Sequence, residues 1–156
     1  MIEMMRYNWR IRESYFELCS SLPREELVKE RNGGAGSILK TFFHIVEMEH
    51  SWMQELLGRP DRPLCYEDNQ TLENIMEMSR ESRIGSEWIF QHSNSYLDGK
   101  LVDVSWLDEK IYYGEILRHV IVHEIHHMGQ LSVWVREMGL KPVCANFIQK
   151  GLMEIV

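Results

Sequence analysis

The sequence has little cysteine and no long apolar run. Its three cysteines, Cys19, Cys65 and Cys144, lie far apart and form no CxxC pair, which argues against a disulfide framework and a cysteine-rich zinc site. No stretch approaches the roughly 18 consecutive apolar residues of a membrane span, and the first residues contain no apolar run of signal-peptide type. We therefore predict a reduced, cytoplasmic protein with no membrane partner.

Positive charge is also scarce. The chain has 17 Lys and Arg against 24 Asp and Glu, a formal net charge of −7. A nucleic-acid surface needs a basic patch or stripe, and an anionic membrane attracts basic segments, so neither partner is expected. The length, 156 residues, is typical of one domain. We predict a single domain that covers residues 1–156.

The hydrophobic pattern is helical over most of the chain, with polar or Gly/Pro-containing breaks between the helical segments. Apolar residues recur at helical spacing over residues 2–20, 37–57, 71–97 and 113–138. Ser37 is a plausible N-cap for the second segment, and Gly139 follows the fourth segment at the position where helices often end. Four long helical patterns predict an all-α four-helix bundle.

Two of the segments outside these four helices have a pattern of their own. Residues 101–106, LVDVSW, alternate apolar and polar side chains as a short strand does. A small hairpin before the fourth helix and an extended connector are both compatible with this pattern. The last residues, 143–156, are apolar enough to pack back on the bundle.

The fourth helical segment is rich in histidine. His119, His123 and His127 are four residues apart and share one helical face, whereas His126 and Glu124 point elsewhere. His123 and His127 occupy positions where core residues belong, and a buried imidazole needs partners for its ring nitrogens. Two histidines one turn apart can bind one metal ion with both Nε2 atoms at about 2.1 Å.

A metal site in a bundle core needs further ligands from a facing helix. His44 lies at the edge of the apolar stripe of the second segment, whereas His50 is rotated about 120° away and is expected on a different surface. We predict a divalent transition metal bound by His44, His123 and His127. The spacing is also compatible with histidines that are satisfied within the core or exposed without a ligand.

The run from His123 to His127 also matches HExxH, the pattern of zinc metalloproteases, in which the Glu acts as a general base. The extended form of that pattern needs a downstream Gly and a third His, and the residues after His127 do not supply them. The first half of the chain is also not rich in strands that would hold a peptide. The protease interpretation is therefore disfavoured.

The run from Gly114 to Leu131, followed by Arg136 to Gly139, resembles the DinB/YfiT-like family, whose members share an HVxxHExxHxGQ helix and an earlier His in the second helix. The segment from Pro142 to Ile148 is similar to the family's ending, so the resemblance covers nearly the whole chain. It implies an up-down-down-up four-helix bundle, often a homodimer. The family's three metal ligands map onto His44, His123 and His127. Many members have Arg where this sequence has Met128.

Three histidine ligands leave open coordination positions, as in catalytic sites, and imidazole suits zinc, nickel, iron or manganese. Related transferases and isomerases use a low-molecular-weight thiol such as mycothiol or bacillithiol. The resemblance therefore implies metal-assisted activation of a thiol that attacks an electrophile. One alternative is a non-catalytic, metal-dependent protein of the stress or DNA-damage response. Another is a metal-dependent hydrolase with Glu124 as base, which the rotation of Glu124 away from His123 opposes.

For several other side chains in these helices, the sequence is compatible with two different roles. His119 is either a hydrogen-bonding group behind the ligands or a packed core residue. Glu47 either orients the ring of His44 or is an ordinary exposed carboxylate. Ile121, Ile125 and Trp134 lie outside the histidine stripe, where they contact other helices or bury a homodimer interface.

Overall fold

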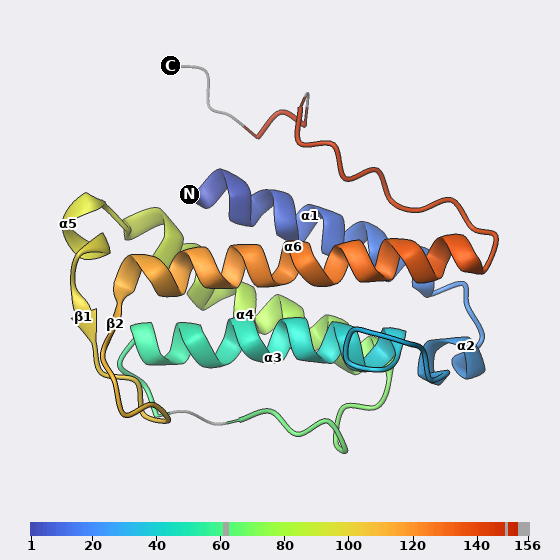
Figure 1. The fold of residues 1–156 in the computed structure, drawn as a ribbon, viewed down its shortest axis with the longest axis horizontal. Helices are drawn as coiled ribbons and strands as arrows, with labels where there is room; N and C mark the ends of the chain where they lie inside the picture. Colours follow the sequence, from blue (N-terminus) through green and yellow to red (C-terminus); the bar gives the residue numbers. More distant parts are fainter. Residues whose placement is uncertain (61–62, 149, 153–156) are drawn as a thin grey trace.

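Long helices dominate the computed structural model, which describes residues 1–60, 63–148 and 150–152 (Figure 1). The elements within these residues are α1 (Ile2–Cys19), α2 (Arg24–Val28), α3 (Ile38–Leu56), α4 (Leu72–His92), α5 (Ser95–Asp98), β1 (Leu101–Val102), β2 (Ile111–Tyr112) and α6 (Tyr113–Glu137). The all-α prediction is confirmed. The long helices α1, α3, α4 and α6 begin and end close to the expected positions, apart from the end of α4.

Capping residues explain where α3 begins and where α3 and α6 end. Ser37 precedes α3, and its hydroxyl accepts a hydrogen bond from the backbone N–H of Lys40 at 3.2 Å. Gly58 follows α3 with φ +62°, and Gly139 follows α6 with φ +76°, in the left-handed region that glycine tolerates. The predicted N-cap and C-terminal glycine are both confirmed.

Two short helices differ from the sequence-based prediction. The helix expected over 71–97 ends at His92, because the side chain of Asn94 accepts hydrogen bonds from the backbone N–H groups of Tyr96 and Leu97 and starts the separate helix α5. The short helix α2 was not predicted, because its five residues are too few to show a helical period.

The segment before α6 forms the hairpin that the alternation allowed. Leu101 pairs with Tyr112 and Val102 pairs with Ile111 in an antiparallel ladder. The connection between the two strands carries Trp106 to the side of α3, where its ring contacts Trp52 with centroids 5.2 Å apart.

The bundle core lies between the four long helices. In Figure 1, α1 and α6 run in one direction and α3 and α4 run in the other, and α3 packs against both α4 and α6. Ile121 and Trp134 are buried in this core, so they contact their own chain and do not form an outer interface. Ile125 is exposed. Within the described residues, no helix is both long and apolar enough to cross a membrane.

The C-terminal segment lies beside α1 (Figure 1). The Tyr7 hydroxyl donates a hydrogen bond to the backbone oxygen of Ala145 at 2.6 Å, and the rings of Tyr7 and Phe147 lie 5.4 Å apart. Leu152 is buried. The prediction that the tail packs on the bundle is confirmed for the described part, whereas residues 149 and 153–156 of the predicted tail lie outside it.

Candidate metal centre

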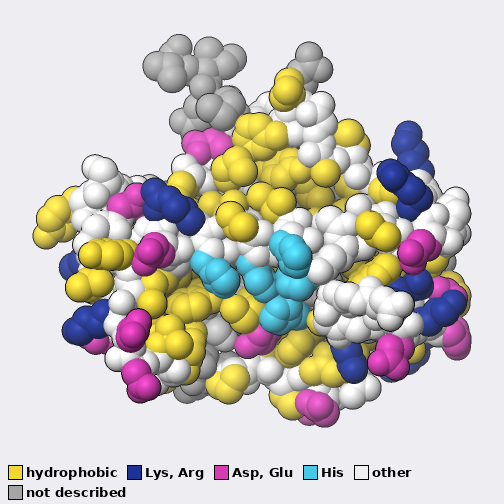
Figure 2. Space-filling view, in the orientation of Figure 1, with side chains coloured by type: hydrophobic (Ala, Val, Ile, Leu, Met, Phe, Trp, Pro, Cys, Tyr) yellow, Lys and Arg dark blue, Asp and Glu magenta, His cyan; other side chains and the backbone are white. Residues whose placement is uncertain are grey.

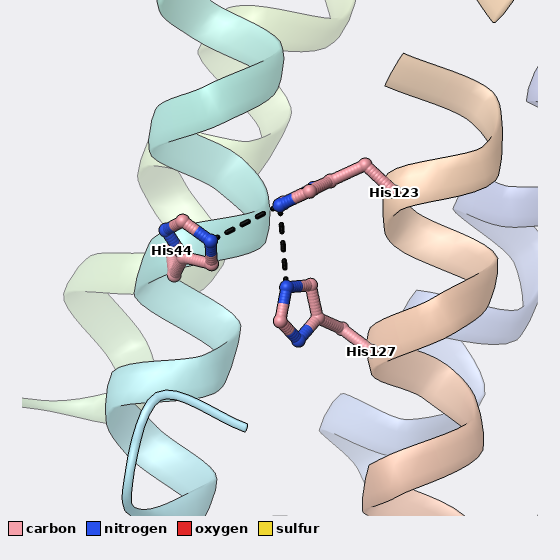
Figure 3. A group of neighbouring side chains, drawn as sticks. All are labelled: His44, His123 and His127. Atoms are coloured by element: carbon pink, nitrogen blue, oxygen red, sulfur yellow. Dashed lines mark hydrogen bonds between the residues drawn. The ribbon is translucent and has the colours of Figure 1, made fainter. Parts of the chain in front are cut away.

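Helices α3 and α6 bring His44, His123 and His127 together. The Nε2 atom of His123 lies 3.0 Å from Nε2 of His44 and 3.2 Å from Nε2 of His127 (Figure 3). Each of the three residues offers a ring nitrogen within 4.8 Å of the others. We call these three residues the histidine cluster.

The helices place the histidine cluster at a half-open position. Helix α6 is unbroken over 25 residues, so His123 and His127 project one turn apart toward α3. His127 is 8% exposed, whereas His44 and His123 are half-buried. Figure 2 shows histidine side chains at the surface in the middle of this face, so a small ligand can reach them.

The environment keeps the histidine cluster neutral. Burial lowers the pKa of His44, and His127 nearby lowers it further. Burial, followed by the neighbouring histidines, lowers the pKa of His123 to about 3. Burial also lowers the pKa of His127, despite a hydrogen bond from its ring to Gln130 that acts in the opposite direction. Neutral imidazole is the form that binds a metal ion.

Gln130 fixes the tautomer of His127. Its Oε1 atom lies 2.7 Å from Nδ1 of His127. An amide oxygen only accepts hydrogen bonds, so Nδ1 carries the hydrogen and Nε2 keeps a free lone pair that faces the cluster. The Gln130 amide nitrogen in turn donates to Nε2 of His126 at 2.9 Å. The contact depends on side-chain geometry, and helical spacing alone did not single out Gln130.

The histidine cluster fits a cation. Since His127 Nε2 has no hydrogen, any hydrogen on His123 Nε2 can point toward only one of its two neighbours, and some lone pairs face one another. A cation satisfies all three nitrogens at once. Nitrogen ligands about 2.1 Å from a tetrahedral ion lie about 3.4 Å from one another, close to the 3.0 and 3.2 Å separations observed.

The other histidines have different surroundings. His119 is exposed, and its ring lies 5.6 Å from the ring of His123 and 5.7 Å from that of Trp52. The interpretation of His119 as a packed core residue is therefore wrong. His50 Nδ1 lies 3.0 Å from the Ser82 hydroxyl on α4, which confirms that it faces a different surface.

A cavity of about 270 Å³ begins one turn beyond His44 along α3. It is lined by Glu47, Met48, Ser51, Trp52 and Trp106. The half-buried Glu47 accepts a hydrogen bond from the Ser51 hydroxyl at 3.4 Å. The indole N–H of Trp52 is buried and has no hydrogen-bond partner among the described residues. The cavity thus combines aromatic walls with polar groups near the histidines.

Glu124 does not take part in this open site. Arg12 of α1 donates to both of its carboxylate oxygens, from Nε at 2.7 Å and from Nη2 at 2.6 Å. Arg12 Nη2 also donates to Glu49 of α3 at 2.5 Å, and all three residues are 1% exposed. We call Arg12, Glu49 and Glu124 the ion cluster. A carboxylate held in this way is unavailable as a base for water, which argues against the hydrolase and protease interpretations.

Burial and the pairing of opposite charges act against each other in the ion cluster. At Glu124 burial has the larger effect and raises the pKa, although Arg12 acts in the opposite direction. Burial disfavours the charged form of Arg12, but the two carboxylates outweigh it and hold the pKa of Arg12 above its ordinary value. The sequence analysis missed this cluster, because Arg12 and Glu124 are 112 residues apart and no local pattern links them.

Comparisons with known proteins show a similar sequence, a similar fold and a matching family. The chain is 41% identical to the uncharacterized protein YizA of Bacillus subtilis (strain 168) over 156 residues, which are 99% of this chain and 98% of that protein. A crystal structure of a DinB-like protein from Bacillus cereus ATCC 10987 superposes with a TM-score of 0.60. That match has 19% identity and covers 87% of this chain and 91% of that one. The model of the DinB family matches residues 1–154. This chain therefore belongs to the DinB family.

Proposed function

We propose that this protein binds one divalent transition metal through His44, His123 and His127, and that the site activates a low-molecular-weight thiol for transfer to an electrophile. The observation that carries the proposal is the convergence of three ring nitrogens within 4.8 Å at a half-open position. Their lowered pKa values keep them ready to bind a cation at neutral pH.

The donor set favours an anionic co-ligand. Three neutral imidazoles leave the charge of a divalent ion uncompensated, and a bound ion lowers the pKa of a thiol or water and stabilises the resulting anion. Gln130 holds the ring of His127 in the required tautomer. In the transfer, the thiol proton passes to solvent, the sulfur forms a bond to the electrophilic carbon, and the leaving group departs with its bonding pair.

The cavity beside His44 has a lining that suits the electrophile. Its aromatic walls, Trp52 and Trp106, suit a flat apolar group. We place the electrophile here, with its reactive carbon toward the histidine cluster.

The first test is the metal content of the purified protein, measured by mass spectrometry. We expect about one transition-metal ion per chain, lost in both His44→Ala and His123→Ala. His92→Ala is the matched control, because His92 is exposed and its ring contacts the backbone oxygen of Trp88 at the end of α4. No metal in the wild type, or metal retained in His44→Ala, contradicts the three-histidine site.

The second test separates an enzyme from a non-catalytic protein. The metal-loaded protein is mixed with bacillithiol or glutathione and an aromatic electrophile such as 1-chloro-2,4-dinitrobenzene, and the thioether product is followed by absorbance. We expect turnover that is lost in His123→Ala. Full metal loading without turnover favours the alternative, a non-catalytic, metal-dependent stress protein.

We also propose that the protein is a cytoplasmic homodimer. Helix α6 exposes Val122, Ile125 and Val133 on its outer side, and such apolar side chains are typical of an interface. The free cysteines suit a reducing compartment. Light scattering should give the mass of two chains for the wild type and of one chain for Ile125→Glu. A monomeric wild type contradicts the dimer.

A further inference from the structure

One buried guanidinium connects all four long helices. Arg12 of α1 donates to both oxygens of Glu124 on α6 and to Glu49 on α3. Its third nitrogen, Nη1, donates to the Ser79 hydroxyl on α4 at 3.0 Å. The guanidinium is planar and its N–H groups are fixed relative to one another, so the bound groups are held in one geometry.

The two carboxylates belong to the helices that carry the histidine cluster. Glu124 directly follows His123 on α6. Glu49 is five residues after His44 on α3, about 7.5 Å along the helix axis. Because one guanidinium binds both carboxylates, a shift of α3 along α6 must break at least one hydrogen bond of Arg12.

Stability alone does not account for the ion cluster. Burying three charged groups carries a large desolvation penalty, and replacement of such a cluster by well-packed apolar residues is often neutral or stabilising. Two carboxylates on one guanidinium also leave a formal excess of negative charge. The cluster is otherwise well satisfied, since the Trp9 indole donates to the second oxygen of Glu49 at 3.0 Å. A buried polar group of this kind can instead specify the register of two elements.

We propose that Arg12, through Glu49 and Glu124, is a positioning residue for the metal centre. It fixes the register of α3 against α6 and so presents the ring nitrogens of His44 and His123 at their observed separation. This inference rests on the proposed metal binding and adds the residues that set its geometry. None of the three residues of the ion cluster belongs to the histidine cluster or lines the cavity beside His44.

The test replaces the ion cluster by apolar residues of similar size in the triple variant Arg12→Met, Glu49→Leu, Glu124→Leu. We expect the metal-free variant to unfold at the same or a higher urea concentration than the wild type. Its zinc affinity, measured by competition with a chelator, should be at least about 10-fold weaker. The visible spectrum of the cobalt(II) form, which reports ligand geometry, should change as well.

Two further variants keep the test decisive if the triple variant fails to fold. Arg12→Lys keeps the charge but loses the planar fork, so it should weaken zinc binding and alter the cobalt spectrum. Ser79→Ala is the control, because it removes the partner on α4 and leaves the link between α3 and α6 intact. Wild-type zinc affinity and an unchanged cobalt spectrum in Arg12→Lys would overturn the proposal.

A metal-free measurement separates this inference from the proposed function. The ¹⁵N signals of the imidazole rings report the contacts between His44, His123 and His127 without any ion. We expect them to shift in Arg12→Lys and to stay unchanged in Ser79→Ala. If the wild type binds no zinc, the proposed function fails, and these spectra still decide the positioning role. Unchanged ring signals in Arg12→Lys would overturn it.

Discussion

Helices α3 and α6 both contribute side chains to two polar clusters, the ion cluster and the histidine cluster, and these clusters differ in charge and in exposure. The ion cluster pairs two carboxylates with one guanidinium, is wholly buried and has hydrogen-bond partners from several helices. The histidine cluster contains neutral rings, is half-open to solvent and brings nitrogen lone pairs face to face. The groups of the first cluster satisfy one another, whereas the three histidines of the second lie close enough together to hold a cation.

From this difference we expect the ion cluster to hold the helices together and the histidine cluster to bind a ligand. Permanent contacts between helices need groups that satisfy one another, because an unpaired buried charge costs several kcal/mol. A binding site needs groups that remain unsatisfied until the ligand arrives. Removal of a partner should therefore destabilise the fold at the ion cluster and weaken ligand binding at the histidine cluster.

The largest effect is expected for Arg12→Met alone. It leaves Glu49 and Glu124 buried together without a counter-charge, so the free energy of unfolding should fall by about 3–5 kcal/mol. Urea denaturation measures this change. Arg80→Met is the control, because Arg80 pairs with Glu77 on the surface of α4 and its loss should cost less than about 0.5 kcal/mol. A similar loss in both variants contradicts a special role for the buried guanidinium.

The second effect concerns zinc and the histidine cluster. A ligand that binds only the folded state at 100 times its Kd stabilises the protein by about 2.7 kcal/mol. Thermal unfolding should therefore show a higher Tm with zinc for the wild type, and the rise should disappear in His44→Ala. Without zinc, we expect His44→Ala to unfold near the wild-type temperature. A zinc-dependent rise that survives His44→Ala would place the ion elsewhere.

The sequence predicted which side chains share one face of a helix, because the helical period determines this. It did not predict contacts that depend on how distant helices pack against one another. The periods of α3 and α6 predicted that His44, His123 and His127 share facing surfaces, and the structure brings them together. The contact between Arg12 and Glu124 depends on how α1 rotates against α6, which no local pattern encodes. The family motif includes the positions of Glu124 and Gln130, but only their contacts show what each does.

The third prediction concerns the residue that orients His127. Gln130→Ala removes the acceptor for Nδ1, so the ring is free to rotate and to change tautomer. Zinc affinity should fall about 10- to 100-fold, as for other partners of metal-bound histidines. Chelator competition measures the change. Gln91→Ala, which removes an exposed amide bonded to Glu87 on α4, should leave the affinity unchanged. Equal affinities in all three proteins contradict the orienting role.

The smallest effect is expected from a substitution in the glycine-rich loop before α3, at Gly34. A Cβ on Gly34 would lie 2.6 Å from the Trp134 ring and 3.0 Å from Oε1 of Gln130, and the φ of Gly34 is +56°. Gly34→Ala should therefore strain the backbone, displace the Gln130 amide and weaken zinc binding a few-fold.

Gly36→Ala is the matched control for this last change. Its φ is +90°, and apart from its chain neighbours no described residue has a heavy atom within 4 Å of a Cβ placed there, so Gly36→Ala shares the backbone strain without the contact. Both variants should lose stability, as measured by urea denaturation. Only Gly34→Ala should lose zinc affinity, because only its side chain reaches the group that holds His127. Equal losses of affinity in both would mean that the loop acts through its backbone and that Gln130 does not transmit the effect.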